Sequence, residues 1–462
     1  MPAGEITNIN SIGLVFFLLM GMLVILLPRR LALLPIIITS CYVTLGQQVV
    51  VASLNFTMMR LIILAGWIRI IARGELCPLR LNTIDKIVIL WVVVGSITYT
   101  LLYQTTGAFI NRLGFAYNAL GMYFLFRFLI RDFEDAIRVI KMVAVIIVPL
   151  ALLMLLENAT GRNAFSIFGG VPEITEIRDG KLRCQGSFAH PISAGTLGAT
   201  LMPLFIALWW RKNLGRVSAL LGLTSSTMIV FLSTSSGPAI AYLAGIVGLM
   251  MWPFRRHMRA VLWGGVFTLI VLDLTIMKSR VWFLIARFSD LLGSSGHGFY
   301  RAQVIDEAIK HINEWWLIGV KYTAHWDLTV LAAYPDQVDI TNQFVQQGID
   351  GGLITMFLFI MIIVFCFRSI GGALRSAEAQ SLEMKTILWS MGAALLTHVA
   401  SFISVSYFDQ IVVFWYLLLA LISTATGYLI KNKIGVAAAP YRHVRLRNEL
   451  LKDTSFIENS RP

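Results

Sequence analysis

Long uninterrupted runs of apolar residues, separated by short polar spacers, dominate this sequence. Most runs are long enough to cross the ~30 Å hydrocarbon core of a bilayer as a helix. They are continuously apolar rather than alternating, which excludes a membrane β-barrel. The pattern therefore predicts an all-α integral membrane protein with twelve or thirteen transmembrane helices. The thirteen segments are 12–27, 31–49, 54–72, 84–102, 113–130, 137–156, 190–210, 217–233, 238–252, 258–276, 350–367, 385–404 and 411–430.

The composition agrees with this class, because 57% of the residues are hydrophobic and only 14% are charged. A soluble domain carries about 25% charged residues. The net charge of +13 does not indicate nucleic-acid binding, because Lys and Arg lie mainly in the short spacers, where they set orientation and contact anionic lipid headgroups. The four cysteines are scattered, without the spacing of a disulfide framework or a zinc site.

The spacers between the apolar segments alternate in charge, which predicts the topology. The basic spacers contain Arg29/Arg30, Arg73/Arg80, Arg131/Arg138, Arg211/Lys212/Arg216, Arg255/Arg256/Arg259, Arg368/Arg375 and Lys431/Lys433. By the positive-inside rule these spacers are cytoplasmic, so the N-terminus lies outside and the C-terminal tail inside. Two longer spacers, about 158–189 and 277–349, then lie on the outer side. We expect four regions: N-terminal membrane helices with the first outer loop (1–180), a core with the large outer loop (181–367), C-terminal membrane helices (368–430) and a basic cytoplasmic tail (431–462).

The second outer loop is too long for a simple connector, so we expect it to carry its own structure. Within YRAQVIDEAIKHINEWWLIGV, Arg301 begins a predicted amphipathic helix. Its expected apolar face is formed by residues at helical spacing: Ile305, Ile309, Ile312 and Trp316. The stretch VWFLIARFSDLL predicts a second helix in the membrane interface, anchored by Trp282 and Phe288.

Few ionisable residues lie inside the apolar segments, which weakens the case for a proton- or ion-coupled carrier. Polar residues gather instead in the two outer loops and predict a site at the outer membrane surface. Three stretches carry the candidates. They are KLRCQGSFAHPISAG with Arg183 and His190, the loop helix with Arg301, and DITNQFVQQGIDGG with Asp339, Thr341, Asn342 and glycines 348, 351 and 352.

The order of these motifs resembles the O-antigen ligase/polymerase superfamily. TSSG is followed by a loop arginine heading an amphipathic helix, then by Asn-x-Phe and Gly-x-x-Gly before a membrane helix; the resemblance covers roughly residues 180–365. It implies a GT-C-like helical membrane enzyme of the bacterial inner membrane. Members transfer glycans from undecaprenyl pyrophosphate at the periplasmic face, either to a growing lipid-linked repeat, to the lipid A core or to proteins.

Two departures from the family pattern favour a polymerase of exopolysaccharide or capsule type over a ligase. The family often has Ser-Arg-Gly where this chain has Ser235-Ser236-Gly237. Ligases carry a His directly before the Asn, where this chain has Thr341. That His is proposed to activate the acceptor in ligases. Ligation to the lipid A core or another acceptor stays the closest alternative.

The resemblance also implies roles for the candidate residues. Arg183 and Arg301 would clamp the diphosphate, because a guanidinium binds phosphate oxygens bidentately and stays charged. Asn342 would orient the acceptor or a sugar hydroxyl. The base candidates are Asp339, His190 and His325, and further substrate contacts are Thr341, Lys321, Trp316 and Ser236. The outer loops contain no Asp-x-Asp motif, so no metal or other cofactor is expected.

Each candidate also has a simpler structural interpretation. Asn342 could cap a helix, Arg183 could be a solvated loop charge, and Trp316 could anchor the interface. Two rival functions stay open, a transporter or flippase of a lipid-linked glycan or small solute, and a scaffold in an export complex. An enzyme needs its arginines on one open face, whereas a carrier needs polar residues along a path to the cytoplasm. Expected partners are the lipid-linked glycan, membrane lipids and chain-length or export proteins.

Overall fold

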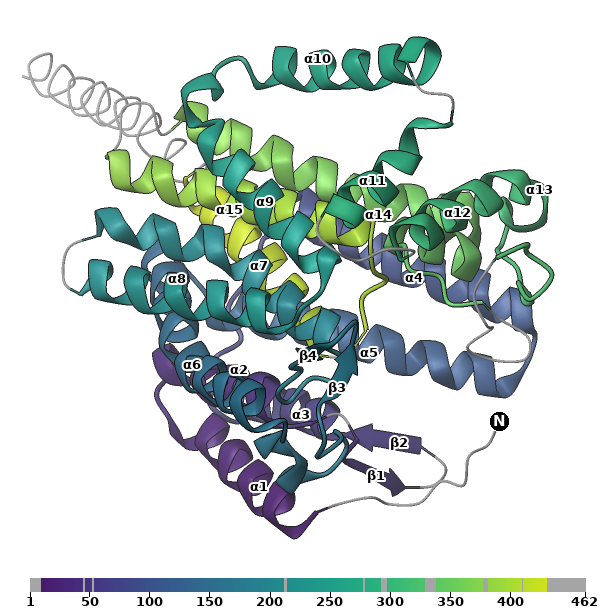
Figure 1. Ribbon diagram of the computed structural model, residues 1–462. Coiled ribbons are helices and arrows are strands. Elements are labelled where there is room, and N and C mark those ends of the chain that lie inside the picture. The colour runs from purple at the N-terminus through teal and green to yellow at the C-terminus, as the bar shows by residue number, and fades with distance from the viewer. Residues whose placement is uncertain are drawn as a thin grey trace, which may run out of the picture.

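The computed structural model describes residues 10–44, 46–51, 54–211, 214–276, 279–291, 297–328, 338–376, 381–408 and 410–429, and it is almost wholly helical (Figure 1). A helix forms within each of the thirteen predicted apolar segments. Seven of the described helices are long and apolar enough to cross a membrane, in agreement with the predicted all-α membrane class. The predicted basic tail, 431–462, lies outside the described residues.

The helices of the first half are α1 (Ser11–Leu26), α2 (Leu33–Tyr42), α3 (Met58–Ala72), α4 (Thr83–Tyr103), α5 (Thr106–Leu129), α6 (Phe133–Thr160), α7 (Pro191–Ala207) and α8 (Gly215–Leu232). Those of the second half are α9 (Ser236–Met250), α10 (Met258–Val271), α11 (Leu284–Leu291), α12 (His297–Lys310), α13 (Ile312–Trp315), α14 (Gln343–Ser376), α15 (Leu382–Phe402) and a final helix, Ile411–Leu429. Two antiparallel hairpins pair β1 (Gln48–Val51) with β2 (Leu54–Thr57) and β3 (Glu176–Arg178) with β4 (Lys181–Arg183).

The second predicted segment, 31–49, differs from the structure. Its helix, α2, has 10 residues and ends at Tyr42. At 1.5 Å per residue it is about 15 Å long, too short to cross a bilayer alone. The apolar residues after it form the β1–β2 hairpin instead, because a run of valines favours strand over helix. The prediction of a helix up to residue 49 from hydropathy alone is therefore wrong, because the chain forms a hairpin after α2.

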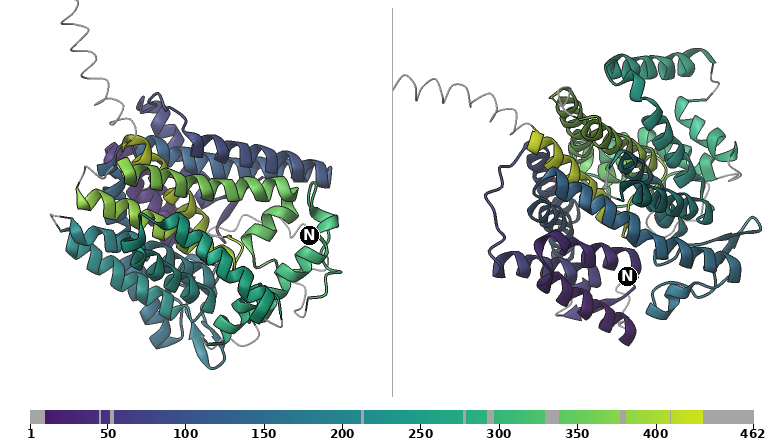
Figure 2. Two further views of the ribbon diagram at one scale, coloured as in Figure 1. Left: turned by 90° about the horizontal axis from the view of Figure 1, so that it is seen from above. Right: turned by 90° about the vertical axis from the view of Figure 1, so that its left-hand side faces the viewer.

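Helix α7 lies inside the bundle, and nearly all of its side chains are buried (Figures 1 and 2). It packs against α8, α9 and α15. Small residues allow this close approach. A Cβ atom added to Gly198 would lie 2.5 Å from the Ser226 carbonyl oxygen, and one on Gly222 would lie 2.5 Å from the Phe205 ring. Close contact through small residues is typical of helices that pack within membranes.

Helix α10 stands apart from the other helices in Figure 1 and in the right-hand view of Figure 2. None of its side chains is buried, although its sequence is apolar on all sides. A helix that is apolar all round is stable when surrounded by hydrocarbon. Its composition therefore fits a helix that lipid surrounds.

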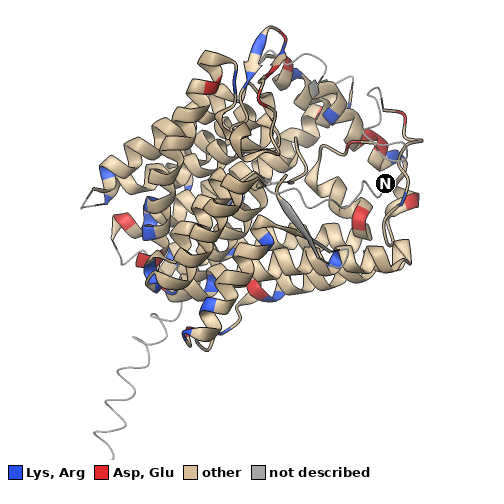
Figure 3. Cartoon of the chain, turned by 90° about the horizontal axis from the view of Figure 1, so that it is seen from below, with Lys and Arg blue, Asp and Glu red and all other residues tan. Residues whose placement is uncertain are grey.

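Several of the predicted basic spacers meet at one end of the bundle, and Figure 3 shows many of the described Lys and Arg residues gathered on one side. Arg29 pairs with Asp135 at 2.6 Å, and Arg211 pairs with Glu134 at 2.6 Å and also with Glu383. Spacers far apart in sequence therefore meet on the same side of the bundle, as the charge pattern predicts.

The predicted amphipathic helix of the large loop forms as α12 and α13, but the predicted packing face is wrong. Ile309, Ile312 and Trp316 are exposed. The buried face is formed by Val304 and Ala308, which belong to a small core with Trp315 of α13 and residues of α14. Helix α12 ends at Lys310, so the chain turns before α13 and the later residues leave the register of the first helix.

Helix α14 is broken where the predicted glycine motif lies. Gly352 has a φ of 77°, in the left-handed region that favours glycine. The backbone after α13 satisfies groups that the break leaves free. The Leu353 amide donates to the Trp316 carbonyl oxygen at 2.9 Å, and the Val320 amide donates to the Ile349 carbonyl oxygen at 3.0 Å. These bonds fasten the large loop to the membrane helix.

Candidate functional site

A cavity of about 1610 Å³ lies between the β3–β4 hairpin, the start of α7, the α8–α9 turn, α12 and the segment 404–408. Figure 1 shows these elements near one end of the bundle. Six of the ten predicted site residues line this cavity: Arg183, His190, Ser236, Arg301, Asp339 and Thr341. The fold thus brings together residues from both outer loops, as the motif order predicts.

Arg183 reaches the cavity from strand β4 and is 3% exposed. Its partner Glu176 faces it in the hairpin register, and the ion pair is 3.0 Å long. Its other terminal nitrogen, Nη2, donates to the Ser235 hydroxyl at 3.0 Å. The guanidinium is therefore held by two partners, and the interpretation as a solvated loop charge is wrong.

Arg301 enters the cavity from α12 and is 6% exposed. Its Nη1 donates to the Ser236 hydroxyl at 3.2 Å. Among the described residues no carboxylate lies within ion-pair distance of it. Burial, with a smaller contribution from Arg183, lowers the pKa of Arg301 to about 10, so the group stays charged at neutral pH. A buried cation without an acidic partner is costly unless an anion binds beside it.

The two arginines are anchored by consecutive serines at the α8–α9 turn. Ser235 holds Arg183, and Ser236 holds Arg301. The preceding residue, Thr234, has a φ of 45°, which is an outlier for a β-branched side chain. Its hydroxyl donates to the Leu182 carbonyl oxygen at 2.8 Å, which ties the turn to strand β4. Such strain persists where the surroundings enforce it, and it concentrates at functional sites.

His190 caps the start of α7 at the cavity wall. Its Nδ1 accepts a hydrogen bond from the Ile192 amide at 3.1 Å, so the proton of the neutral ring lies on Nε2. Burial, and then the charge of Arg183, lowers the pKa of His190 to about 4. A neutral ring with its free nitrogen protonated donates a hydrogen bond. This arrangement makes His190 a weak candidate for the base.

Asp339 and Thr341 reach the cavity from the segment before α14. The Asp339 side chain is open to the cavity, and its carbonyl oxygen accepts from the Tyr300 hydroxyl at 2.6 Å. Partial desolvation raises the pKa of the Asp339 carboxyl, which makes it a stronger base than an ordinary aspartate. The Thr341 hydroxyl is buried and has no hydrogen-bond partner among the described residues, so it is a candidate to bond a substrate atom.

Asn342 does not line the cavity. Its side-chain oxygen accepts from the Phe344 and Val345 amides at 3.0 and 3.1 Å, and its amide donates to the Ile403 carbonyl oxygen at 3.3 Å. Asn342 is therefore the helix cap of the simpler interpretation, and its predicted contact with an acceptor stays a prediction that this cavity does not support. Because it fixes the start of α14, it positions the neighbouring Thr341.

Lys321, Trp316 and His325 also lie away from the cavity. The Lys321 ammonium lies 6.0 Å from the centre of the Tyr103 ring, and Trp316 is exposed. His325 bonds to Glu314 at 2.9 Å, which excludes it as a base within this cavity. The loop therefore directs these three residues away from the cavity.

Three residues at or beside the cavity were not predicted from the sequence. Glu176 pairs with Arg183 because EIRDGKLR forms a hairpin, and its Asp-Gly centre is a recognised signal for that turn. Ser235 belongs to the TSSG motif, in which only Ser236 is a predicted substrate contact. Tyr300 precedes the predicted arginine, and no sequence signal distinguished it.

The apolar part of the cavity lies along α8 and α9. Phe231 and Leu243 line it, yet they are 75% and 51% exposed on the outer surface of the bundle. The cavity therefore runs from the buried arginines to side chains that face the membrane. Such a shape accommodates a molecule with an anionic head and a hydrocarbon tail.

A second cavity of about 380 Å³ lies deeper in the bundle, between α3, α4, α5 and α14. Arg112 and Trp415 line it, and in the described part of the chain the buried Arg112 Nε and Trp415 Nε1 have no hydrogen-bond partner. Gln343 lines this cavity whereas Thr341 lines the first, so the start of α14 separates the two.

Neither a scan of protein-family models nor a search of curated proteins finds a match to this chain. The resemblance to the O-antigen ligase/polymerase superfamily therefore stays a prediction. The fold and the cavity themselves define a class. The chain is a multi-pass helical membrane protein with two buried arginines in one cavity that continues to its membrane-facing surface.

Proposed function

We propose that this protein is a periplasmic-face glycosyltransferase of the bacterial inner membrane that polymerises repeat units carried on undecaprenyl pyrophosphate. The observation that carries the proposal is the buried pair of Arg183 and Arg301 on consecutive serines. Arg301 has no acidic partner among the described residues, so the site favours an added anion. A diphosphate joined to a long hydrocarbon chain matches both the arginines and the apolar wall at Phe231.

In the proposed reaction the diphosphate lies against the two guanidinium groups, and the polyprenyl chain follows α8 and α9 toward lipid. An acceptor hydroxyl oxygen bonds to the anomeric carbon of the donor sugar. The bond between that carbon and the phosphate oxygen breaks, and undecaprenyl pyrophosphate leaves with both bonding electrons. Asp339 takes the hydroxyl proton. The arginines stabilise the charge that develops on the leaving diphosphate, so this step uses only side chains of the chain itself.

The choice of polymerase over ligase follows from the residue before Asn342. A threonine hydroxyl at position 341 can donate a hydrogen bond, but it is far too weakly basic to activate an acceptor. Ligation to the lipid A core or another acceptor is the nearest alternative. In the proposed topology twelve or thirteen helices cross the membrane, with the N-terminus in the periplasm and the C-terminus in the cytoplasm.

Reconstitution of the purified chain in lipid, with undecaprenyl-pyrophosphate oligosaccharide as the only substrate, tests the function. A ladder of longer lipid-linked glycans establishes a polymerase, and a single product that depends on an added acceptor lipid establishes a ligase. If the native donor gives neither product, the enzyme proposal fails, and movement of the donor across the bilayer becomes the measurement to make.

The rate is expected to depend on ionisation of Asp339. Because desolvation raises the pKa of this carboxyl above its ordinary 3.8, the acid limb of the pH–rate profile should lie above that value, with activity falling as pH drops through it. Asp339→Asn should lower the rate about 10²–10⁴-fold. Asp327→Asn, an exposed aspartate of the same loop, is the matched control. An unchanged acid limb in the Asp339 variant would rule out this base.

A further inference from the structure

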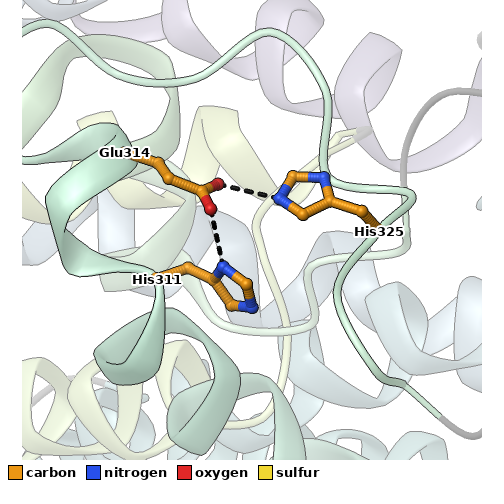
Figure 4. Close-up of side chains that lie close together, drawn as sticks. All are labelled: His311, Glu314 and His325. Atoms are coloured by element: carbon orange, nitrogen blue, oxygen red, sulfur yellow. Dashed lines mark hydrogen bonds and ion pairs between the residues drawn. The ribbon is translucent and has the colours of Figure 1, made fainter.

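We propose that His311, Glu314 and His325 form a zinc site on the large outer loop, separate from the arginine-lined cavity. The three side chains come from the turn after α12, from α13 and from the following segment (Figure 4). Their ligating atoms all lie within 4.8 Å of one another. Two imidazoles and one carboxylate form a ligand set that zinc favours, with a fourth position left for water.

The ligating atoms already converge on one point beside the Glu314 carboxylate. His311 Nδ1 lies 2.7 Å from one Glu314 oxygen, and His325 Nε2 lies 2.9 Å from the other. Figure 4 shows both rings directed at this one carboxylate. Two ligands at the tetrahedral angle and about 2.1 Å from a zinc ion lie about 3.4 Å from each other, so each nitrogen–oxygen pair must separate by about 0.5–0.7 Å. The ion can therefore replace the two hydrogen bonds with small side-chain movements.

The surroundings of His311 provide a second, independent indication. Its other nitrogen, Nε2, lies 3.5 Å from a Glu307 oxygen. A carboxylate beside the free nitrogen of a metal-binding histidine is a recurring arrangement, because it sets the tautomer and strengthens the ligand. The ring also stacks on Trp326, with 5.5 Å between centres and an angle of 11° between planes. The ring is thus held in one orientation by groups other than the proposed ligands.

The bound metal would fix the position of the segment before α14, which carries the cavity residues Asp339 and Thr341. Trp326 is buried in the same small core as Val338 and Ile340. Val338 and Ile340 flank Asp339, and Ile340 immediately precedes Thr341. Asp339 and Thr341 both line the cavity. The described residues between α13 and α14 form no regular strand or helix. A metal that joins His325 to α13 would therefore hold the segment that presents both side chains.

Zinc binding should be measured on the full chain, purified without a histidine tag in lipid nanodiscs and stripped with a chelator. We expect one tightly bound zinc ion per chain after dialysis against ZnCl₂, and a higher melting temperature with zinc than without. His325→Gln and Glu314→Gln should each abolish stoichiometric binding and the zinc-dependent shift. Glu307→Gln should weaken binding about 10–100-fold. His257→Gln, at the start of α10, is the matched control and should change neither quantity.

A hydrogen-bonded cluster without metal gives a different pattern. The site is refuted if the unaltered chain retains no zinc, or if His325→Gln retains as much zinc as His257→Gln. It is also refuted if the melting temperature of the unaltered chain is the same with and without zinc. Because none of these readouts requires glycan transfer, the result stands whether or not the proposed enzymatic function is correct.

Discussion

Replacing Arg301 with alanine is expected to abolish glycan transfer while leaving the protein folded and inserted. Removal of one charge-stabilising donor at a transfer site costs about 10²–10³-fold in rate. The Arg301 guanidinium bonds to the Ser236 hydroxyl and has no carboxylate partner among the described residues, so its loss leaves no buried acid unpaired. Product formation from purified lipid-linked donor measures the rate, and size-exclusion chromatography measures folding.

Two further variants separate the guanidinium from general positive charge. Arg301→Lys keeps the charge but loses the planar fork, so we expect it to recover only part of the rate. Arg162→Ala removes an exposed arginine of the first outer loop, which pairs with Glu173, and should retain full activity. Full activity of the Arg301→Ala protein would contradict the diphosphate clamp. Equal losses of transfer rate in the Arg301→Ala and Arg162→Ala proteins would also contradict a specific role for Arg301.

Replacing Gly352 with alanine is expected to give the largest loss of stability, about 2–4 kcal/mol from backbone strain and steric overlap together. Gly352 has a φ of 77°, which alanine adopts only with strain. Its added Cβ would lie 2.2 Å from the Leu317 carbonyl oxygen and 2.9 Å from the Ile318 amide nitrogen. Backbone cannot rotate aside as a side chain can, so the loop must separate from α14.

Thermal unfolding of the variant in nanodiscs, followed by tryptophan fluorescence, measures this loss. Gly372→Ala is the matched control, because Gly372 lies in the same helix and a Cβ there would contact nothing within 4 Å. We expect the control to match the unaltered protein or to melt slightly higher, since alanine favours helix over glycine. Similar melting temperatures for the two variants would show that the contact between loop and helix contributes little.

The helices could be predicted from the sequence because each long apolar run has one stable solution in lipid. The prediction failed where an apolar run has another way to satisfy its backbone hydrogen bonds. At 31–49 the apolar run divides between the short α2 and strand β1, since a hairpin packed on other helices also satisfies its backbone. In α12 the hydrophobic spacing identified a helix but not its buried face, because Ile309 is apolar and yet faces outward.

The cavity could be predicted only in part, because motif spacing does not determine direction. Thr341 and Asn342 are adjacent, but one side chain lines the cavity and the other caps α14. His325 lay in the correct loop, yet its position depends on the turn after α12, which no periodicity reveals. Arg183 and Arg301 do meet in one cavity, each on a serine hydroxyl, because the polar residues that hold them are concentrated at the ends of the outer loops.

The two arginines belong to loops more than a hundred residues apart, yet their spacing is set by one peptide bond, the one that joins Ser235 to Ser236. Neither loop alone can create the pair. During synthesis the first arginine can dock as soon as the α8–α9 turn exists, whereas the second must wait for the large loop to fold. In the proposed enzyme, activity would therefore require completed assembly, because a chain without the folded loop holds only one of the two arginines.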